Sequence, residues 1–202
     1  MTSSFLVLAG LWIGFGALHS LLASVRFKRW VESWLGAGYR WYRLLYSIQS
    51  TALAFAIFLY GATLPNQTLW PHNSMIRFLG MIFAAYGFLV VRLAFKGYST
   101  RQFLGLSGTT DDETLPLVVD GAQRYVRHPL YSGTFLLLIG FLLFSPTLAN
   151  AIMVGALILY TLIGIRWEEQ KLIQRFGDAY REYQKEVPAL IPREWPRFGA
   201  KE

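Results

Sequence analysis

Several residue types are missing or scarce in this 202-residue chain, and each absence narrows the chemistry that the protein can perform. The chain has no cysteine, so disulfides, cysteine-ligated zinc, iron–sulfur clusters and thiol nucleophiles are excluded. Charged residues make up only 15% of the chain, whereas a soluble domain carries about 25%. Together with 54% hydrophobic residues and long uncharged runs, this shortage of charge indicates an integral membrane protein.

Five apolar segments are candidates to cross the membrane, at residues 5–25, 44–64, 78–95, 130–145 and 150–165. The first has no Lys or Arg before it and is longer than the apolar region of a signal peptide, so we expect a retained helix. The last two are separated by a short turn at residues 145–150, which predicts a helical hairpin. The predicted fold is therefore an all-α integral membrane protein with about five transmembrane helices.

The remainder of the chain completes this predicted organisation. Residues 1–95 form a membrane region of three helices, and residues 96–202 form a core with a long loop, the hairpin and the tail. At helical spacing, the apolar residues of the tail fall on one stripe with Glu169, which predicts an amphipathic C-terminal helix. These stripe residues are Ile173, Phe176, Tyr180 and Tyr183.

The basic residues predict the orientation of the chain in the membrane. Of the 19 Lys and Arg residues, five lie at 26–43, four at 96–127 and eight at 166–201, all on one side of five spans. The positive-inside rule then places the N-terminus outside and the tail in the cytoplasm, where all twelve acidic residues also fall. The basic residues form no stripe, so nucleic-acid binding is not expected despite the net charge of +7.

One polar motif lies at the start of the fourth apolar segment, in residues 125–133. Pro129 suits the first position of a helix and keeps His128 extended, so the N–H groups that follow face the membrane boundary. A helix N-terminus beside Arg127 favours a carboxylate or a phosphate ligand. The alternative interpretation is an interfacial anchor formed by Arg127, His128 and Tyr131.

A second polar motif lies where the fifth segment leaves the membrane. Glu169 is centred on the apolar stripe of the tail, so its carboxylate must be paired or face a polar cavity. Arg166, one turn earlier, is one candidate partner, and the alternative is a plain ion pair within the helix. Glu168 could equally belong to a solvated turn. Because the hairpin returns to the same face, we expect this motif to lie close to Arg127 and His128.

Taken in order along the chain, these motifs resemble the carboxy-terminal signature of the membrane methyltransferases, a group that includes isoprenylcysteine carboxyl methyltransferases and phospholipid N-methyltransferases. The resemblance covers about residues 95–193. Residues 19–23, 27–28 and 103–106 resemble bacterial relatives such as methanethiol S-methyltransferase, and also a membrane family linked to nitric-oxide metabolism. The residues that carry the main resemblance are 127–133, 168–169, Leu172, 176–177, Tyr180, Tyr183, 187–188 and 191–192.

The resemblance implies an S-adenosylmethionine-dependent methyltransferase of the EC 2.1.1 class in a bacterial inner membrane, with the methyl donor bound under the tail. It implies that Glu169 acts as a base or orients the cofactor and that Arg166 contributes to catalysis, although Arg166 stands closer to the glutamate than the arginine of the family does. The acceptor would be a small or lipophilic thiol, carboxylate or amine. The implied cofactor-binding residues are Arg127, His128, Pro129, Leu130, Tyr131, Glu168, Glu169 and Tyr180.

Some alternatives stay open at this point. A non-enzymatic membrane protein that handles a cofactor or assists assembly would keep the same helices. His19 lies within the first apolar segment, where it is either functional or hydrogen-bonded to a neighbouring helix. Three scattered histidines without cysteine predict no metal site. Membrane lipids are expected partners, and the oligomeric state stays open because small residues such as Gly10, Gly14 and Gly16 could pack within or between chains.

Overall fold

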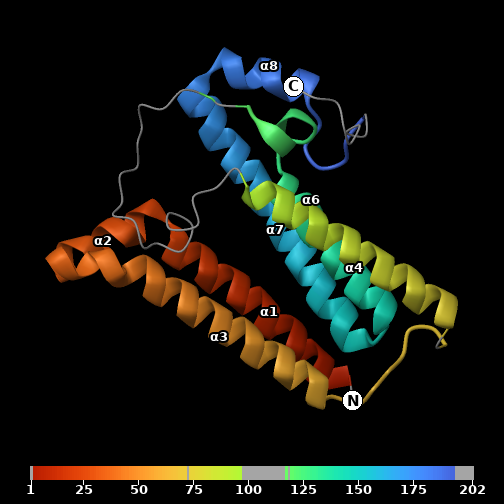
Figure 1. Cartoon of the computed structure of the whole chain (residues 1–202). Helices are drawn as coiled ribbons and strands as arrows, with labels where there is room; N and C mark the ends of the chain where they lie inside the picture. The colour runs from red at the N-terminus through yellow and green to blue at the C-terminus, as the bar shows by residue number, and fades with distance from the viewer. Residues whose placement is uncertain (1, 72, 97–116, 118, 194–202) are drawn as a thin grey trace. The chain divides into compact units, whose positions relative to one another are not determined.

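The computed structural model describes residues 2–71, 73–96, 117 and 119–193 (Figure 1). The regular elements of these described residues are helices, and one isolated β-bridge pairs Thr68 with Thr147, which lie outside the helices. The predicted all-α fold is confirmed. His72, the motif at 103–106, most of the long loop from residue 96 to residue 127, and the end of the tail lie outside the described residues.

The chain divides into two compact units. The first contains α1 (Thr2–Ala23), α2 (Val25–Leu35), the 3-10 helix η1 (Gly36–Trp41), α3 (Tyr42–Thr63) and the first part of α7 (Leu148–Phe176). The second contains α4 (Ser74–Phe95) from Met75 onward, the 3-10 helix η2 (Gly121–Arg124), α6 (Pro129–Phe144), the remainder of α7, and α8 (Asp178–Glu186). The division between residues 95 and 96 that the sequence suggests stays a prediction.

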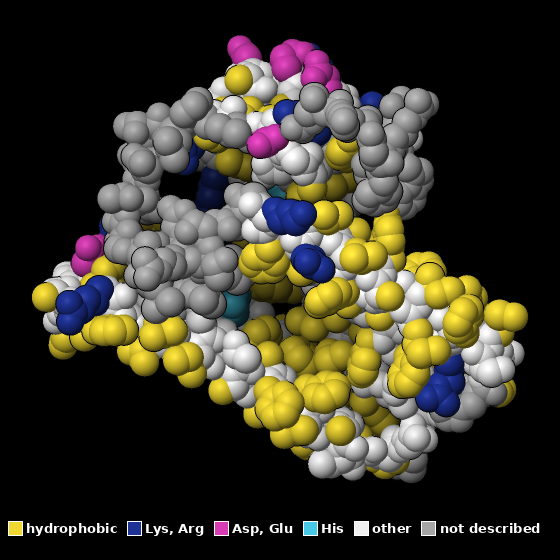
Figure 2. Space-filling model, viewed as in Figure 1, with side chains coloured by type: hydrophobic (Ala, Val, Ile, Leu, Met, Phe, Trp, Pro, Cys, Tyr) yellow, Lys and Arg dark blue, Asp and Glu magenta, His cyan; other side chains and the backbone are white. Residues whose placement is uncertain are grey.

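The helices have the length and composition of membrane spans. Four candidate spans are present in the described residues, Thr2–Ala23, Val25–Thr63, Ser74–Phe95 and Leu148–Phe176, and the apolar helix α6 has 16 residues. Large apolar side chains on them are exposed, including Leu6 at 72%, Ile13 at 71% and Phe88 at 61%. Hydrophobic side chains cover much of the surface seen in Figure 2. Such a surface suits lipid, so the predicted integral membrane protein is confirmed.

In the first unit, α1 packs against α3 around a polar cluster. His19 Nε2 lies 2.7 Å from the Tyr46 hydroxyl, and His19 Nδ1 lies 3.1 Å from Ser50 Oγ. Where α1 ends and α3 begins, the Tyr42 hydroxyl donates to the Leu22 carbonyl at 2.8 Å. Polar side chains within apolar helices need such partners. The expectation that His19 is hydrogen-bonded to a neighbouring helix is confirmed, because Tyr46 and Ser50 belong to α3.

In the second unit, two pairs of glycines let α4 and α6 approach to backbone contact. A Cβ atom on Gly87 would lie 2.7 Å from the Gly133 carbonyl oxygen, and one on Gly140 would lie 2.6 Å from the Gly80 carbonyl oxygen. Any side chain larger than hydrogen would therefore separate the helices. Small residues at such contacts are the usual way for membrane helices to pack closely.

Two features differ from the sequence-based expectations. The segment between the first two predicted spans contains a helix that the sequence analysis does not predict: residues 25–35 form α2, which Ser24 caps by accepting a hydrogen bond from the Phe27 N–H. The tail is not one continuous helix, because α7 ends at Phe176 and Gly177 has a φ angle of +57° before α8 begins. The stripe that the sequence suggests is therefore divided between two helices.

Candidate functional site

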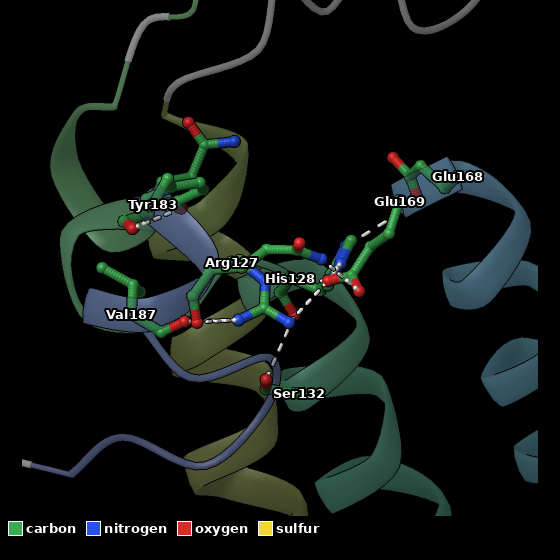
Figure 3. A network of polar contacts seen from close by, with 9 residues as sticks. Arg127, His128, Ser132, Glu168, Glu169, Tyr183 and Val187 are labelled. Atoms are coloured by element: carbon green, nitrogen blue, oxygen red, sulfur yellow. Dashed lines mark hydrogen bonds and ion pairs between the residues drawn. The ribbon is translucent and has the colours of Figure 1, made fainter. Parts of the chain in front are cut away.

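Four segments of the second unit meet at one group of polar side chains, shown in Figure 3: the residues before α6, the last turns of α7, α8, and the segment after α8. Buried Pro129 begins α6, as expected for a residue without an N–H group to satisfy. Arg127 and His128 immediately precede it. Glu168 and Glu169 belong to α7.

The guanidinium group of Arg127 is hydrogen-bonded to one carboxylate and to two backbone carbonyl groups. Its Nε and Nη2 atoms each lie 2.7 Å from Glu169 Oε1. Its Nη1 atom donates to the carbonyl oxygens of Gln184, at 3.2 Å, and of Val187. The side chain of Arg127 is only 10% exposed. Arg127 therefore joins α7 to both α8 and the segment that follows it, instead of pointing toward solvent.

The carboxylate of Glu169 accepts hydrogen bonds at both oxygens. Besides Arg127, His128 Nε2 lies 3.1 Å from Oε1, and the Gln184 amide donates to Oε2 at 3.0 Å. The side chain of Glu169 is 16% exposed. A carboxylate with an ion pair and additional donors meets the requirement for a charge that is withdrawn from water.

Glu168 provides a more exposed carboxylate beside the same histidine. Its Oε2 atom lies 3.8 Å from His128 Nδ1, and its side chain is 47% exposed. His128 is buried, and its ring stacks with that of Tyr131 at a centroid distance of 5.7 Å. The two glutamates thus occupy different environments, because Glu169 is enclosed by donors whereas the side chain of Glu168 is partly exposed.

Backbone hydrogen bonds hold the segment after α8 against the start of α6. The N–H groups of Arg127 and His128 donate to the carbonyls of Pro188 and Ala189 at 2.9 and 3.0 Å. Ser132 Oγ donates to the Leu190 carbonyl at 2.7 Å. These bonds fix residues 187–190 as a strap across the site, which we call the tail strap.

Tyr180 of α8 is packed in the interior of this unit, with 1% of its surface exposed. Its ring contacts Tyr183, whose hydroxyl donates to the Gln123 carbonyl of η2 at 2.7 Å. Burial, with the negative charge of Glu169 as a smaller cause, raises the pKa of Tyr180 to about 12. Tyr180 is therefore a neutral phenol at physiological pH.

The structure brings Arg127, His128, Glu168 and Glu169 together, as the hairpin suggests. Within the described part of the chain, Glu169 pairs with Arg127 and His128, whereas Arg166 is exposed. The residues that the sequence missed are Gln184 and the carbonyl groups of the tail strap. Their only sequence signal is the pair of prolines in the resemblance pattern, which does not reveal hydrogen-bond partners.

The charges of the cluster suit a cationic ligand. Glu169 and Arg127 compensate each other, so the carboxylate of Glu168 lies outside that pair, with His128 as its neighbour. The aromatic ring of Tyr131 is stacked beside that histidine, and aromatic faces also attract cations. The cluster can therefore hold a positively charged group near an exposed carboxylate.

Comparison with known proteins identifies named relatives. A methanethiol S-methyltransferase from Crocosphaera subtropica is 25% identical over 207 residues, covering 95% of this chain and 76% of the relative. Methanethiol S-methyltransferase 2 from Bradyrhizobium diazoefficiens is 27% identical and covers 91% of this chain and 71% of the relative. Protein-S-isoprenylcysteine O-methyltransferase from Rattus norvegicus is 31% identical over 157 residues, covering 74% of this chain but 53% of the relative.

These relatives confirm the predicted resemblance to the membrane methyltransferases. No solved structure shows a significant match to the chain. The family described as NnrU protein matches residues 7–195, nearly the full length. The chain therefore belongs to the NnrU protein family.

Proposed function

We propose that this protein transfers a methyl group from S-adenosylmethionine to a small or lipophilic acceptor at the cytoplasmic face of a bacterial inner membrane. The observation that carries the proposal is the exposed carboxylate of Glu168 beside His128. The adjacent buried pair of Arg127 and Glu169 positions the part of α7 that carries Glu168. The similarity to proteins named as S- and O-methyltransferases supports the same reaction class.

The chemistry of the donor set fits the positive part of the cofactor. S-adenosylmethionine carries a sulfonium and an ammonium group, and Glu168 with the ring of Tyr131 would hold one of these cations. Glu169, Gln184 and Val187 take up four of the five N–H groups of Arg127, so we do not assign the cofactor carboxylate to it. The start of α6 at Pro129 and Leu130 would hold that carboxylate instead, through the positive end of the helix dipole.

We assign Glu169 the orienting role and not the role of a base. Both of its oxygens accept hydrogen bonds from positioned donors, so taking a proton would require it to break them. Tyr180, fully buried, would act by packing beneath the site. Arg166, the other predicted catalytic residue besides Glu169, is exposed on α7. Its positive charge would face an anionic acceptor.

This arrangement favours an acceptor that arrives deprotonated. S-adenosylmethionine, when bound, would supply an electrophilic methyl group, and the site would have to hold the lone pair of the acceptor in line with the carbon–sulfur bond that is to be broken. A thiolate or a carboxylate needs no base for this step, whereas an amine or a phenol does. We therefore propose a thiol or a carboxylic acid as the acceptor, with a thiol as the first choice to test.

The test has two stages and uses the full-length protein in detergent and in membranes. The first measures saturable binding of S-adenosylmethionine, and the second measures transfer of labelled methyl to small thiols, prenylcysteines and aminophospholipids. We expect binding and transfer to a thiol or a carboxylate. The site variant for both stages is Glu168→Gln. Its matched control is Glu182→Gln, which alters an exposed glutamate paired with Lys185 on α8. Absence of saturable binding would refute the proposal and favour the non-enzymatic cofactor-handling alternative.

A further inference from the structure

The helix α2 presents two chemically distinct faces. At 100° per residue, one face carries Phe27, Trp30, Val31 and Trp34, with Leu35 at its edge beside Lys28. The opposite face carries Arg29, Glu32 and Ser33 together with Val25, and Arg26 lies at the other edge. No residue of α2 is buried in the structure. The helix therefore exposes an apolar stripe, which a water-soluble protein would normally cover.

The apolar stripe is strongly aromatic. The exposed fractions are 54% for Trp30, 77% for Trp34 and 50% for Leu35. The rings of Phe27, Trp30 and Trp34 form a continuous row, with centroid distances of 5.3 and 5.8 Å between neighbours. Tryptophan is enriched where hydrocarbon meets headgroups, because its ring is apolar and its N–H can reach a polar partner.

The position of α2 in the chain places it at a membrane boundary. It begins two residues after α1 ends, and η1 connects it to α3. The hydrogen bond from Tyr42 to the Leu22 carbonyl joins the end of α1 to the start of α3, so both spans end at the same boundary. In Figure 1, α2 lies at the joined ends of α1 and α3. A helix in this position meets the headgroup region and not bulk water.

The charges of the segment specify the kind of lipid. Between the two spans, and including the first turn of α3, the sequence carries five basic residues and one acidic residue, Glu32. The basic residues are Arg26, Lys28, Arg29, Arg40 and Arg43. In Figure 2, Lys and Arg side chains lie beside hydrophobic ones at the α2 end of the molecule. Basic residues beside an interfacial helix attract anionic headgroups.

We propose that α2 is an interfacial helix that lies in the plane of the membrane, with its aromatic stripe in the upper acyl region and its basic face on anionic phospholipid headgroups. The occupant of this surface is thus the lipid bilayer itself. The proposal rests on the first unit of the structure alone and is independent of the proposed methyl transfer.

The absence of cysteine makes a direct test simple, because a single introduced cysteine carries the only spin label. The full-length chain would be labelled through Trp34→Cys at the centre of the apolar face or Ser33→Cys on the polar face. Each variant is placed in vesicles of phosphatidylcholine alone, or of phosphatidylcholine and phosphatidylglycerol in equal amounts. The measurement is the collision rate of the label with oxygen, which concentrates in lipid, relative to a water-soluble nickel complex.

We expect a higher ratio of oxygen to nickel collisions at residue 34 than at residue 33, because the apolar face of an interfacial helix enters the acyl boundary. We also expect phosphatidylglycerol to increase this difference, and the combined Arg26→Gln, Lys28→Gln and Arg29→Gln variant to lose that increase. The control Arg181→Gln with Lys185→Gln, at exposed ion pairs of α8, should retain it.

Three outcomes would overturn the proposal. Equal accessibility to water at both positions would show that α2 does not enter the bilayer. A label at residue 34 that is shielded from both reagents in every vesicle would indicate a protein partner, such as a second copy of the chain. An unchanged ratio with phosphatidylglycerol would refute the assignment of anionic lipid.

Discussion

Arg127 and Glu169, separated by 42 residues in the chain, form the central ion pair of the candidate site, with two nitrogen atoms of the arginine at 2.7 Å from one carboxylate oxygen. The pair links the residue segment just before α6 to the last turns of α7, away from the turn that joins the two helices. Because the same arginine also bonds to Gln184 and Val187, one side chain connects the membrane-embedded core with the tail. The fold of the tail therefore depends on the positive charge of Arg127, which the carbonyl groups of the tail help to enclose.

Loss of this pair should release the tail. In Glu169→Gln, Arg127 keeps its charge but loses the compensating carboxylate, and breaking a buried pair in this way costs about 3–5 kcal/mol. We expect a lower unfolding temperature in detergent and faster proteolysis of residues after 177. The control Arg181→Gln removes an exposed pair with Asp178, which is worth about 0–1 kcal/mol, so its stability should be nearly unchanged. Equal stability of the two variants would contradict the central role of the pair.

The close contact of α4 and α6 yields a second prediction. In Gly87→Ala the new methyl group would meet the Gly133 carbonyl oxygen at 2.7 Å, so the helices must separate. Such overpacking costs about 1–3 kcal/mol. The midpoint of thermal aggregation in detergent should fall, and Gly133→Ala should behave alike. Gly10→Ala, where no atom lies within 4 Å of the added carbon, should be neutral or slightly stabilising.

Gly177 sets the direction in which α8 leaves α7. Its φ angle of +57° is unfavourable for residues with a Cβ atom, so Gly177→Ala should destabilise the turn by about 1 kcal/mol or more. Protection of the α8 amides in hydrogen exchange should decrease. In Gly164→Ala, which alters a helical glycine of α7 with open space around it, protection should be retained. A fully protected α8 in Gly177→Ala would show that the turn tolerates a side chain.

The buried phenol of Tyr180 predicts a loss of stability in alkali. Its pKa in the folded protein, about 12, lies above the ordinary value of 10.0, so the folded state holds the proton more tightly. Its contribution to stability is complete below pH 10 and is lost as the pH rises through 12. We expect denaturant unfolding in detergent to show this decline, and Tyr180→Phe to lack part of it. Tyr125→Phe, which alters an exposed tyrosine, should keep the full decline.

Apolar length and the placement of charge predicted the helices and the meeting of Arg127 and His128 with the two glutamates, because a short hairpin leaves little freedom. The sequence could not predict which cation pairs with Glu169. Arg166 was suggested by helical spacing, but the three-dimensional partner is Arg127, which approaches from another helix. The helix α2 is not predicted, because its basic residues enter only the count of charges that sets the orientation, and that count hides their helical periodicity.

The contrast between the two glutamates gives the sharpest test of the proposed site. Glu168 is 47% exposed, and within the described residues its ion-pair partner is His128 at 3.8 Å, so Glu168→Gln should leave the fold intact. If Glu168 holds a cation of S-adenosylmethionine, its loss removes a charged interaction worth about 1.5–3 kcal/mol, which weakens binding roughly 10- to 100-fold. Titration of the purified protein with S-adenosylmethionine, alongside an unfolding curve, separates this effect from the instability expected for Glu169→Gln. Full affinity in a stably folded Glu168→Gln would remove Glu168 from the cofactor site while leaving the ion pair of Arg127 and Glu169 as a purely structural device.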